Sequence, residues 1–390
     1  MITVAEALDQ LFALVSPLET EDVPLTQANG RVLARDVTAT RNQPPFAASA
    51  MDGYAVNAQT IKAGQTFGVI GEAAAGHKWS GTVGPSQAVR IFTGAPLPDG
   101  TDYVIIQENV TREGDVITLD DSTNDKPHVR PAGADFKTGD TIKAPRLLSP
   151  ADIALLAAMN IAAVPVTRRP VIAIIATGDE LVQPGETPAD DQIIASNSYG
   201  LAALVQSLGA EARLLPIARD TKPSLDLAFD LAADADLIVT IGGASVGDHD
   251  LVGDVAQSKG MDRSFYKVAM RPGKPLMAGR MGNAAMIGLP GNPVSAMVCG
   301  HIFLAPVIRK LLGLGTAAAL RETLTLAQDA PENGPREHYM RARIDADGVT
   351  IFDRQDSALL TVFAQANCLA VRPVNDPARK TGDPIEIIRL

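Results

Sequence analysis

Two kinds of hydrophobic pattern divide the N-terminal part of the chain. Residues 3–15 carry apolar side chains at helical spacing, which predicts a helix with one apolar face: Val4, Leu8, Leu11, Phe12 and Val15. Residues 46–138 instead have frequent glycines and short runs such as DYVIIQENV and DVITL, which are typical of strands. A second helical pattern follows around Leu155 and Met159, and we expect it to return to the N-terminal segment. The β-rich stretch would then be an insertion.

From residue 169 onward, short apolar runs alternate with helical segments. The runs PVIAIIA, DLIVTI and AAMIGL are apolar at nearly every position. Strands of this kind are covered by helices on both faces, which predicts a doubly wound α/β domain with a parallel sheet. Ligands bind such sheets outside the carboxyl ends of the strands. After about residue 320 the pattern is β again, with a hairpin in YMRARIDADGVTIFD, and it indicates a small C-terminal β-barrel or sandwich.

Composition and charge narrow the class of protein. The chain has 390 residues and a formal net charge of −11, which argues against general binding to nucleic acid or to an anionic membrane. Its start, MITVAEALDQ, lacks the basic and apolar regions of a secretory signal, so we expect a cytoplasmic protein. The two cysteines lie far apart and neither CxxC nor HExxH occurs, which disfavours a zinc site.

Four expected loops lie at the carboxyl edge of the α/β sheet and carry polar residues or glycines. They are ATGDEL with Asp179 and Glu180, ARD with Asp220, GGASVGDHD at 242–250 and GLPGNPVSA at 288–296. In the last of these, Asn292 and Pro293 can begin a helix. The free N–H groups of that helix start, with Ser295 nearby, suit a phosphate.

A basic segment, KVAMRPGKP, contributes Lys267, Arg271 and Lys274 to a chain that is otherwise acidic. Carboxylates and phosphates at one site usually indicate Mg²⁺, which prefers oxygen ligands and substrate phosphates. The basic residues could hold a second anion. Neither GxxxxGK[ST] nor GxGxxG occurs, so an ordinary P-loop or dinucleotide site is disfavoured.

Each of these segments also has a purely structural explanation. GDEL and PGNP fit tight turns, aspartates in loops are mostly caps or solvated, and KVAMRPGKP fits an exposed loop. The segments PPFAASAMDGYAV, with Asp52, and IFTGAPLPDG, with Thr93, fit β-turns. What favours a functional site is the joint occurrence of polar loops at one sheet edge.

The motifs are, however, specific as an ordered set. SAMDGYAV, IFTGAPLPDGTDYVIIQE, ATGDEL, SNSYGLAALV, GGASVGDHD, KVAMRPGKP and GLPGNPVSA follow one another, after PLTQANGRVLARDV. Together they resemble the MoeA family of molybdopterin molybdenumtransferases, to which the E domain of gephyrin is related. The resemblance runs from about residue 3 to the C-terminus.

The resemblance implies a homodimer of four-part subunits. The parts are a discontinuous N-terminal domain, an inserted β-rich domain, an α/β molybdopterin-binding domain and a C-terminal β-barrel. Their expected ranges are 1–43 with 139–168, then 44–138, 169–316 and 317–390. The implied reaction inserts molybdate into the dithiolene of adenylylated molybdopterin and releases AMP, with Mg²⁺ as the cofactor.

The resemblance also implies roles for individual residues. Asp52 and Thr93 would approach the site from the inserted domain of the other subunit. Asp179, Glu180 and Asp220 would help to hold the adenylylated ligand, and the metal ligands would be Glu180, Asp220 and Asp250. We expect the backbone at Gly242, Gly243 and Ser245 to approach the phosphorylated pterin, while Asp248 could simply shape the turn.

The anionic oxygens would be met by basic residues. Lys267, Arg271 and Lys274 would contact them, with Arg271 and Lys274 closest to molybdate; Asp52, Asp250, Lys267 and Arg271 are the expected catalytic residues. Ser295, Arg341 and Ser357 would line the same pocket. Asp-Ser-Ala stands around Ser357 where the family leads us to expect Gly-Ser-Gly or Gly-Ser-His, and Arg271 replaces a lysine of some relatives.

Three other functions remain open from the sequence, one of them a regulatory protein whose site is vestigial. A molybdopterin adenylyltransferase shares the α/β domain, but the flanking domains and the MDGYA motif argue against it. A molybdopterin-binding scaffold without catalysis is the second, although nothing in the chain resembles an added interaction linker. An adenylyltransferase and recipient molybdoenzymes are possible protein partners, and neither nucleic acid nor membrane is expected.

Overall fold

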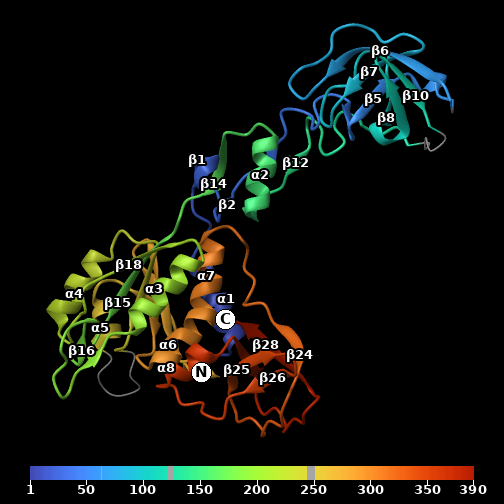
Figure 1. Cartoon of the computed structure of the whole chain (residues 1–390). Helices are drawn as coiled ribbons and strands as arrows, with labels where there is room; N and C mark the ends of the chain where they lie inside the picture. The colour runs from blue at the N-terminus through green and yellow to red at the C-terminus, as the bar shows by residue number, and fades with distance from the viewer. Residues whose placement is uncertain (63, 121–125, 244–250) are drawn as a thin grey trace.

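The computed structural model of the chain is elongated, with a β-rich domain at one end and an α/β domain packed on a C-terminal β-domain at the other (Figure 1). It describes residues 1–62, 64–120, 126–243 and 251–390. The predicted Ser245, Asp248 and Asp250 lie outside these described residues. A narrow middle segment joins the two ends.

The β-rich domain is a six-stranded sheet in the order β8-β5-β7-β6-β10-β9. Its strands are β5 (Gly53–Val56), β6 (Thr66–Ala73), β7 (Gln87–Ile91), β8 (Tyr103–Ile106), β9 (Val110–Glu113) and β10 (Val116–Leu119). One apolar cluster includes Tyr54 and Phe67, and a second includes Val89 and Val104. Successive residues of β5 and β8 point alternately into one cluster and the other, because side chains alternate between the two faces of a sheet. A short pair, β4 (Ala48–Ser49) with β11 (Val129–Arg130), brings the chain back out.

The middle segment is built from both sides of this insertion. The sheet β1-β14-β2-β13 pairs β1 (Thr20–Pro24) and β2 (Val32–Leu33) with β13 (Arg146–Leu147) and β14 (Ala163–Thr167), while β3 (Val37–Thr38) pairs with β12 (Thr141–Ile142). Helix α2 (Pro150–Ala158) begins with a capping box of Ser149 and Asp152, and Leu156 packs into the shared core. The predicted return of the chain to the N-terminal segment therefore involves residues 20–43.

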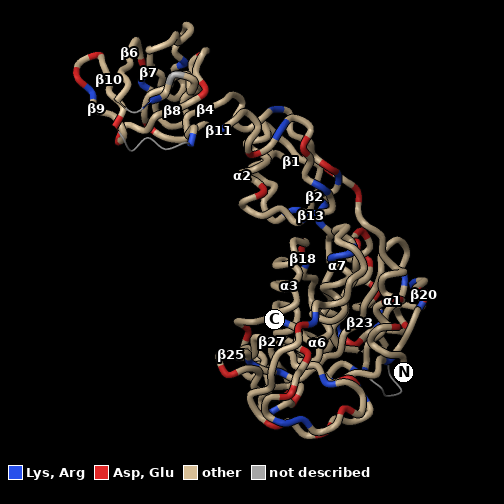
Figure 2. The backbone as a smooth tube through the Cα atoms, turned by 90° about the vertical axis from the view of Figure 1, so that its right-hand side faces the viewer, with Lys and Arg blue, Asp and Glu red and all other residues tan. Residues whose placement is uncertain are grey.

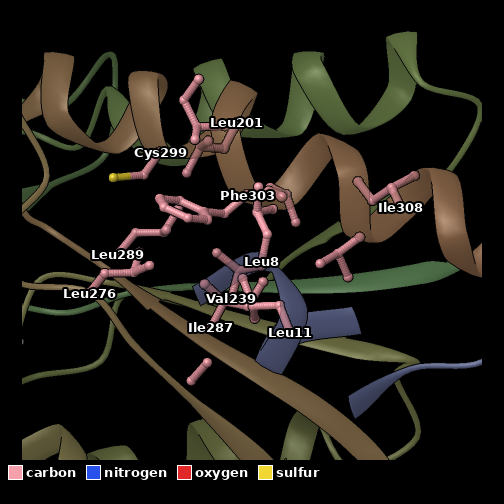
Figure 3. Close-up of a cluster of buried hydrophobic side chains, with 14 of the residues drawn as sticks. Leu8, Leu11, Leu201, Val239, Leu276, Ile287, Leu289, Cys299, Phe303 and Ile308 are labelled. Carbon is pink, nitrogen blue, oxygen red and sulfur yellow. The ribbon is translucent and has the colours of Figure 1, made fainter. Parts of the chain in front are cut away.

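Helix α1 (Val4–Leu14) does not join that middle core. Its predicted apolar face is buried, but it packs in the largest core, where Figure 3 shows Leu8 and Leu11 next to Val239 and Ile287 of the α/β sheet. Arg280 and Lys310 donate side-chain hydrogen bonds to the carbonyl oxygens of Leu14 and Phe12, at 2.6 and 2.5 Å. The chain thus starts in the α/β domain before it enters the middle segment.

The α/β domain has a six-stranded sheet in the order β18-β15-β19-β23-β22-β20. The strands are β15 (Val171–Ala176), β18 (Glu211–Leu214), β19 (Leu237–Ile241), β20 (Asp262–Tyr266), β22 (Met277–Met281) and β23 (Ala284–Leu289), and a short pair, β16 (Leu181–Val182) with β17 (Ile193–Ile194), lies beside it. Helices α3 (Asn197–Ser207), α6 (Pro293–Cys299) and α7 (Ala305–Leu311) cover one face together with α1, and α4 (Lys222–Leu231) and α5 (Leu251–Ser258) cover the other. This is the expected doubly wound α/β domain.

The sheet is mixed, however, whereas the sequence predicted a parallel one. Strands β18, β15, β19 and β23 are parallel, but β22 and β20 are antiparallel to their neighbours. The turn at Gly282, between β22 and β23, makes a tight hairpin that leaves no room for a crossover helix. Strand β20 ends at Tyr266, because the next residue, Lys267, has φ +73° and turns the chain out of the sheet.

The long C-terminal helix of this domain is interrupted. Residues 300–304 form a π-turn between α6 and α7, and Pro306 is the second residue of α7. A proline lacks the N–H that an α-helix needs, so the wider turn accommodates it. The stretch Pro293–Leu311 has a mean hydropathy of 1.4, enough for a membrane span, but 78% of it is buried in this core, around Phe303 and Ile308 (Figure 3).

The C-terminal domain is a small closed barrel. Its strands are β21 (Met270–Arg271), β24 (Glu322–Thr325), β25 (Glu337–Asp345), β26 (Gly348–Ile351), β27 (Cys368–Arg372) and β28 (Pro384–Arg389), in the order β21-β25-β27-β28-β24, with β26 paired to β25. A bridge between Leu326 and Val349 links the end of β24 to β26 and closes the ring. Gly348 permits this, since a Cβ there would lie 2.5 Å from the Thr325 carbonyl oxygen. The multidomain fold class expected from the sequence, with its α/β domain, inserted β-rich domain and C-terminal barrel, is confirmed.

Candidate active site

A pocket of about 640 Å³ opens at the carboxyl edge of the α/β sheet. Thr177 and Gly178 line it after β15, Asp220 after β18, Gly242 and Gly243 after β19, and residues 290–293 after β23. The carboxyl ends of parallel strands meet at one edge, which is why these loops, distant in sequence, form one wall. The structure thus brings the predicted loops together, as far as their residues are described.

Two glycines allow the backbone to form the floor of this pocket. Gly242 has φ +93°, and a Cβ there would approach the Thr177 carbonyl oxygen to 2.8 Å. Gly243 has φ +66°, and a Cβ there would lie 2.1 Å from the Cγ2 of Val252. Any side chain at either position would strain the turn and fill the space beside Thr177.

Carboxylates gather on one side of the pocket. The backbone N–H of Asp220 donates a 3.2 Å hydrogen bond to Oδ1 of Asp179, and Arg219 holds this turn by donating to the carbonyl oxygens of Asp179 and Leu181. Burial raises the pKa of Asp220, and the neighbouring carboxylates of Asp179 and Glu180 raise it further. A cation at this side would relieve the repulsion, since it favours the ionised carboxyl groups.

The described residues alone do not complete a metal site here. Glu180 and Asp220 both line the pocket, but within the described ranges no three Asp, Glu, His or Cys side chains are grouped closely enough to hold a metal ion. The third predicted ligand, Asp250, lies outside the described residues. Carboxylate oxygens are nevertheless the donors that Mg²⁺ prefers, and it commonly takes its remaining ligands from water and phosphate.

The three predicted basic residues lie on a loop next to the pocket rather than in its wall. Pro275 of the same loop does line the pocket. The loop is closed by hydrogen bonds from the backbone N–H groups of Lys267 and Val268 to the carbonyl oxygens of Leu276 and Lys274. The Lys267 ammonium lies 4.8 Å from the centre of the Tyr266 ring, and Arg271 extends into the C-terminal barrel as part of β21.

The C-terminal domain closes the pocket through one loop. Ala358 lines the pocket, and the carbonyl oxygen of the preceding Ser357 accepts a 2.9 Å hydrogen bond from the N–H of Val294 in the first turn of α6. The expectation that this helix start offers only free N–H groups is therefore wrong for Val294. Ser295 is buried on the same turn and is not part of the pocket lining.

Arg341 is fully buried beside this loop. Its Nη2 donates a 3.1 Å hydrogen bond to the carbonyl oxygen of Asp356, while Nε and Nη1 have no partner among the described residues. Burial lowers the pKa of Arg341 to about 10, and the charge of Arg271 adds to the effect. A buried guanidinium without a counter-ion is costly, so it is a strong candidate to meet an anion.

Asp52 and Thr93 lie elsewhere in the molecule. Both belong to the inserted domain, which Figure 1 and Figure 2 place at the far end from the pocket. Oδ1 of Asp52 accepts hydrogen bonds from the backbone N–H and the hydroxyl of Thr93, at 2.7 and 2.8 Å. These bonds hold the pKa of Asp52 below its ordinary value. Within one chain the structure therefore joins the two residues to each other but not to the pocket.

Residues 193–198 form a wall of the pocket that the sequence did not reveal. Ile193 and Ile194 are exposed on β17, and Ser196 and Asn197 follow at the start of α3. The Nδ2 of Asn197 donates a 2.7 Å hydrogen bond to the carbonyl oxygen of Gly291, which fixes two walls to each other. The motif SNSYG suggested only a helix start, because a Ser-Asn pair before a helical pattern is a common cap.

Comparison with known proteins shows similarity along nearly the whole chain. Residues 173–310, which carry the pocket, match the family described as a probable molybdopterin binding domain. Residues 2–160 match the MoeA N-terminal region (domain I and II), and residues 323–390 match the MoeA C-terminal region (domain IV).

Whole proteins match over the same range. A molybdopterin molybdenumtransferase of Nostoc sp. is 36% identical, with 100% of this chain and 94% of the relative covered, and one of Haemophilus influenzae is 37% identical over 80% and 78%. The crystal structure of a molybdopterin biosynthesis MoeA protein from Pyrococcus horikoshii superposes with a TM-score of 0.86 at 26% identity over 100% of both chains. The chain belongs to the MoeA family, as the sequence motifs indicated.

Proposed function

We propose that this protein is a transferase that inserts molybdenum into molybdopterin, using molybdate and the adenylylated pterin and releasing AMP. Membership of a family whose relatives are named molybdopterin molybdenumtransferases supports the reaction class. The observation that carries the proposal is a pocket with carboxylates on one side and, beside the loop that covers it, the buried Arg341, which has no ion pair among the described residues. Such an arrangement suits a ligand with a phosphoanhydride at one end and a reacting oxyanion at the other.

On the acidic side, Glu180 and Asp220 would hold Mg²⁺ together with Asp250 and the ligand phosphates. A bound Mg²⁺ would neutralise phosphate charge during cleavage of the anhydride. The carboxylates would fix the position of the metal. The backbone at Gly242 and Gly243 would admit the phosphorylated pterin, because neither residue has a side chain there. Positioning and charge neutralisation are the main requirements of phosphoryl chemistry.

On the basic side, molybdate is a tetrahedral dianion and needs cationic donors. Lys274 and Arg271 lie on the loop that contributes Pro275 to the pocket, and Arg341 has two N–H groups without a partner among the described residues. Ser357 links α6 to the loop beside Arg341: its carbonyl oxygen accepts a hydrogen bond from the N–H of Val294, and the carbonyl oxygen of the preceding Asp356 accepts one from Arg341. We assign Lys267 a supporting role, since its ammonium is engaged with the Tyr266 ring.

The working unit would be a homodimer. Asp52 and Thr93 form an exposed, hydrogen-bonded pair at the far end of the chain, too remote to act on a ligand in the pocket of the same subunit. A second subunit could bring its inserted domain to this pocket, because an elongated chain paired about a two-fold axis creates two equivalent shared sites.

A mixing experiment tests both parts of the proposal. Wild-type protein should release AMP and form molybdenum cofactor from adenylylated molybdopterin and molybdate. The single variants Asp52→Ala and Lys274→Ala should fold but lose transfer by about 100-fold, the usual cost of a lost charge-stabilising group. After subunit exchange, equal amounts of the two should recover about a quarter of wild-type activity, because half of the dimers are mixed and each has one intact shared site.

The possible results separate the alternatives. An inactive mixture of two inactive variants would contradict the shared site but not the reaction. Formation of pyrophosphate from ATP and molybdopterin by the wild type would favour an adenylyltransferase. Tight pterin binding without turnover of the adenylylated compound would favour a scaffold.

A further inference from the structure

A second, smaller cavity lies in the C-terminal barrel, outside the pocket described above. It has a volume of about 200 Å³, and the side chains that face it include Arg271, Asn333, His338, Met340, Gln355 and Arg372. It shares no lining residue with the larger pocket. The cavity is small and several polar side chains line it, which suits a compact ligand rather than a nucleotide.

Three neighbouring strands supply one row of this cavity. Arg271 on β21 pairs in register with His338 on β25, and His338 pairs with Arg372 on β27. Residues directly opposite each other on adjacent strands project to the same face of a sheet. The row therefore places an imidazole between two guanidinium groups.

The imidazole of His338 is buried, and one of its nitrogens has no hydrogen-bond partner among the described residues. His338 is 5% exposed, and its Nε2 has no hydrogen-bond partner among the described residues. Burial lowers the pKa of His338 to about 3, and the charges of four arginines act in the same direction: Arg271, Arg341, Arg336 and Arg372. A buried polar atom that is left unpaired is unfavourable unless a ligand or water satisfies it.

The positive charge here is only partly balanced. Arg372 forms an ion pair with Asp376, which Arg379 also binds at 2.8 Å, and Nη2 of Arg372 donates to the Pro377 carbonyl oxygen. Glu332 lines the cavity but is exposed, so it can remain in solvent. The guanidinium of Arg271, by contrast, has no hydrogen bond or ion pair with another described residue. Arg271 and Nε2 of His338 are thus the groups available to a ligand.

We propose that this cavity binds a small tetrahedral oxyanion between Arg271 and His338, as a site separate from the pterin pocket. A cation is disfavoured by the arginines, whereas an oxyanion presents acceptors to both the guanidinium and the imidazole. Because Arg271 adjoins both this cavity and the loop that carries Lys274, an anion held here lies next to the place where molybdate would react. Oxyanion binding does not depend on the proposed function; only the use of the site to supply molybdate rests on it.

The test is to locate and measure binding in the full chain without pterin. Crystals soaked in tungstate should show an anomalous tungsten peak between Arg271 and His338, and titration calorimetry with molybdate and with sulfate should detect binding. A preference for molybdate would favour a substrate-supply site, and equal binding of sulfate a general oxyanion site. In His338→Phe, which keeps a ring and removes both nitrogens, the peak should vanish and affinity at this site should fall at least tenfold.

Two further variants guard against a purely structural effect. His338→Gln offers an amide N–H near the position of Nε2 and should restore much of the binding. His301→Phe removes the other buried histidine, whose pKa is lowered to about 4 by burial alone, and should bind as the wild type does. Tungsten found only beside Lys274 and Arg341, or unchanged affinity in His338→Phe, would overturn the proposal.

Discussion

The carboxyl edge of the α/β sheet carries acidic residues, and the adjoining face of the C-terminal barrel carries basic ones. In both regions burial shifts a pKa in the direction that disfavours the charged form. At the sheet edge, burial and the neighbouring carboxylates of Asp179 and Glu180 raise the pKa of Asp220. In the barrel, Arg341 is buried without an ion pair among the described residues, and burial lowers its pKa to about 10. Each region holds a charge that has no ion pair within the described part of the chain.

The difference teaches that neither region is arranged for stability alone. Structural ion pairs in the same barrel look different: Arg372 is as buried as Arg341 but is paired with Asp376. Charges of both signs without an ion pair among the described residues, one at the pocket and one beside the loop that covers it, are typical of a ligand-binding site. Replacing members of each region tests this interpretation.

The largest effect is expected at the two buried arginines. Arg341→Met should lower transfer activity by about 100-fold or more, because a donor to the oxyanion is lost. It should also raise the thermal unfolding midpoint, since an unpaired buried charge is replaced by an apolar side chain of similar length. Arg372→Met should instead destabilise the fold by about 3 kcal/mol, because it breaks a buried ion pair. Thermal unfolding and a single-turnover assay measure both, and equal losses of stability would contradict the comparison.

A smaller effect is expected on the acidic side. Asp220→Asn removes a carboxylate that we propose binds the metal, so the Mg²⁺ concentration needed for half-maximal transfer should rise by about tenfold. The folded chain should not become less stable, because the repulsion from Asp179 and Glu180 is relieved. Asp226→Asn, on α4 where this half-buried residue pairs with Lys222, is the control and should leave the Mg²⁺ requirement unchanged. An unaltered requirement in Asp220→Asn would remove this residue from the metal site.

The smallest effect concerns pH and the basic side. His338 and His301 have folded-state pKa values lowered to about 3 and about 4, whereas an unfolded histidine titrates near its ordinary value of 6.5. Below that value the unfolded chain binds protons that the folded chain does not, so stability falls as pH decreases. Each histidine contributes a slope of about 1.4 kcal/mol per pH unit. Denaturant titrations between pH 6 and pH 5 should show that the free energy of unfolding depends less steeply on pH in His338→Phe than in the wild type, by the contribution of one histidine. An identical pH dependence would mean that His338 is already protonated in the folded state.

The sequence by itself determined the order of the elements and the position of the acidic loops. Strands that are apolar throughout must be buried on both faces, and the residues that follow them must emerge at one edge, so Asp179, Glu180 and Asp220 could be grouped without a structure. The motif order was likewise enough to identify the family, since the order and spacing of motifs are properties of the chain alone.

Only the tertiary structure decided how distant segments pair. Apolar strands have the same pattern in parallel and antiparallel sheets, so the reversal at β22 left no trace in the sequence. Helix α1 has an apolar face that would suit either neighbouring core, and packing selected the α/β domain. The wall at Ile193 and Ile194 arises from the pairing of β16 with β17, two strands too short to show a period.

The burial of Arg341 and His338 was also decided only by the tertiary structure. Both are polar residues in a strand, where sequence reasoning places them at the surface, and both are enclosed because β21 and the 356–358 loop cover them. The separation of Asp52 from the pocket likewise follows from the narrow middle segment, whose direction depends on the pairing of β1 with β14 and of β2 with β13. Local patterns record which residues can be buried, whereas the partners that bury them come from contacts between segments far apart in the chain.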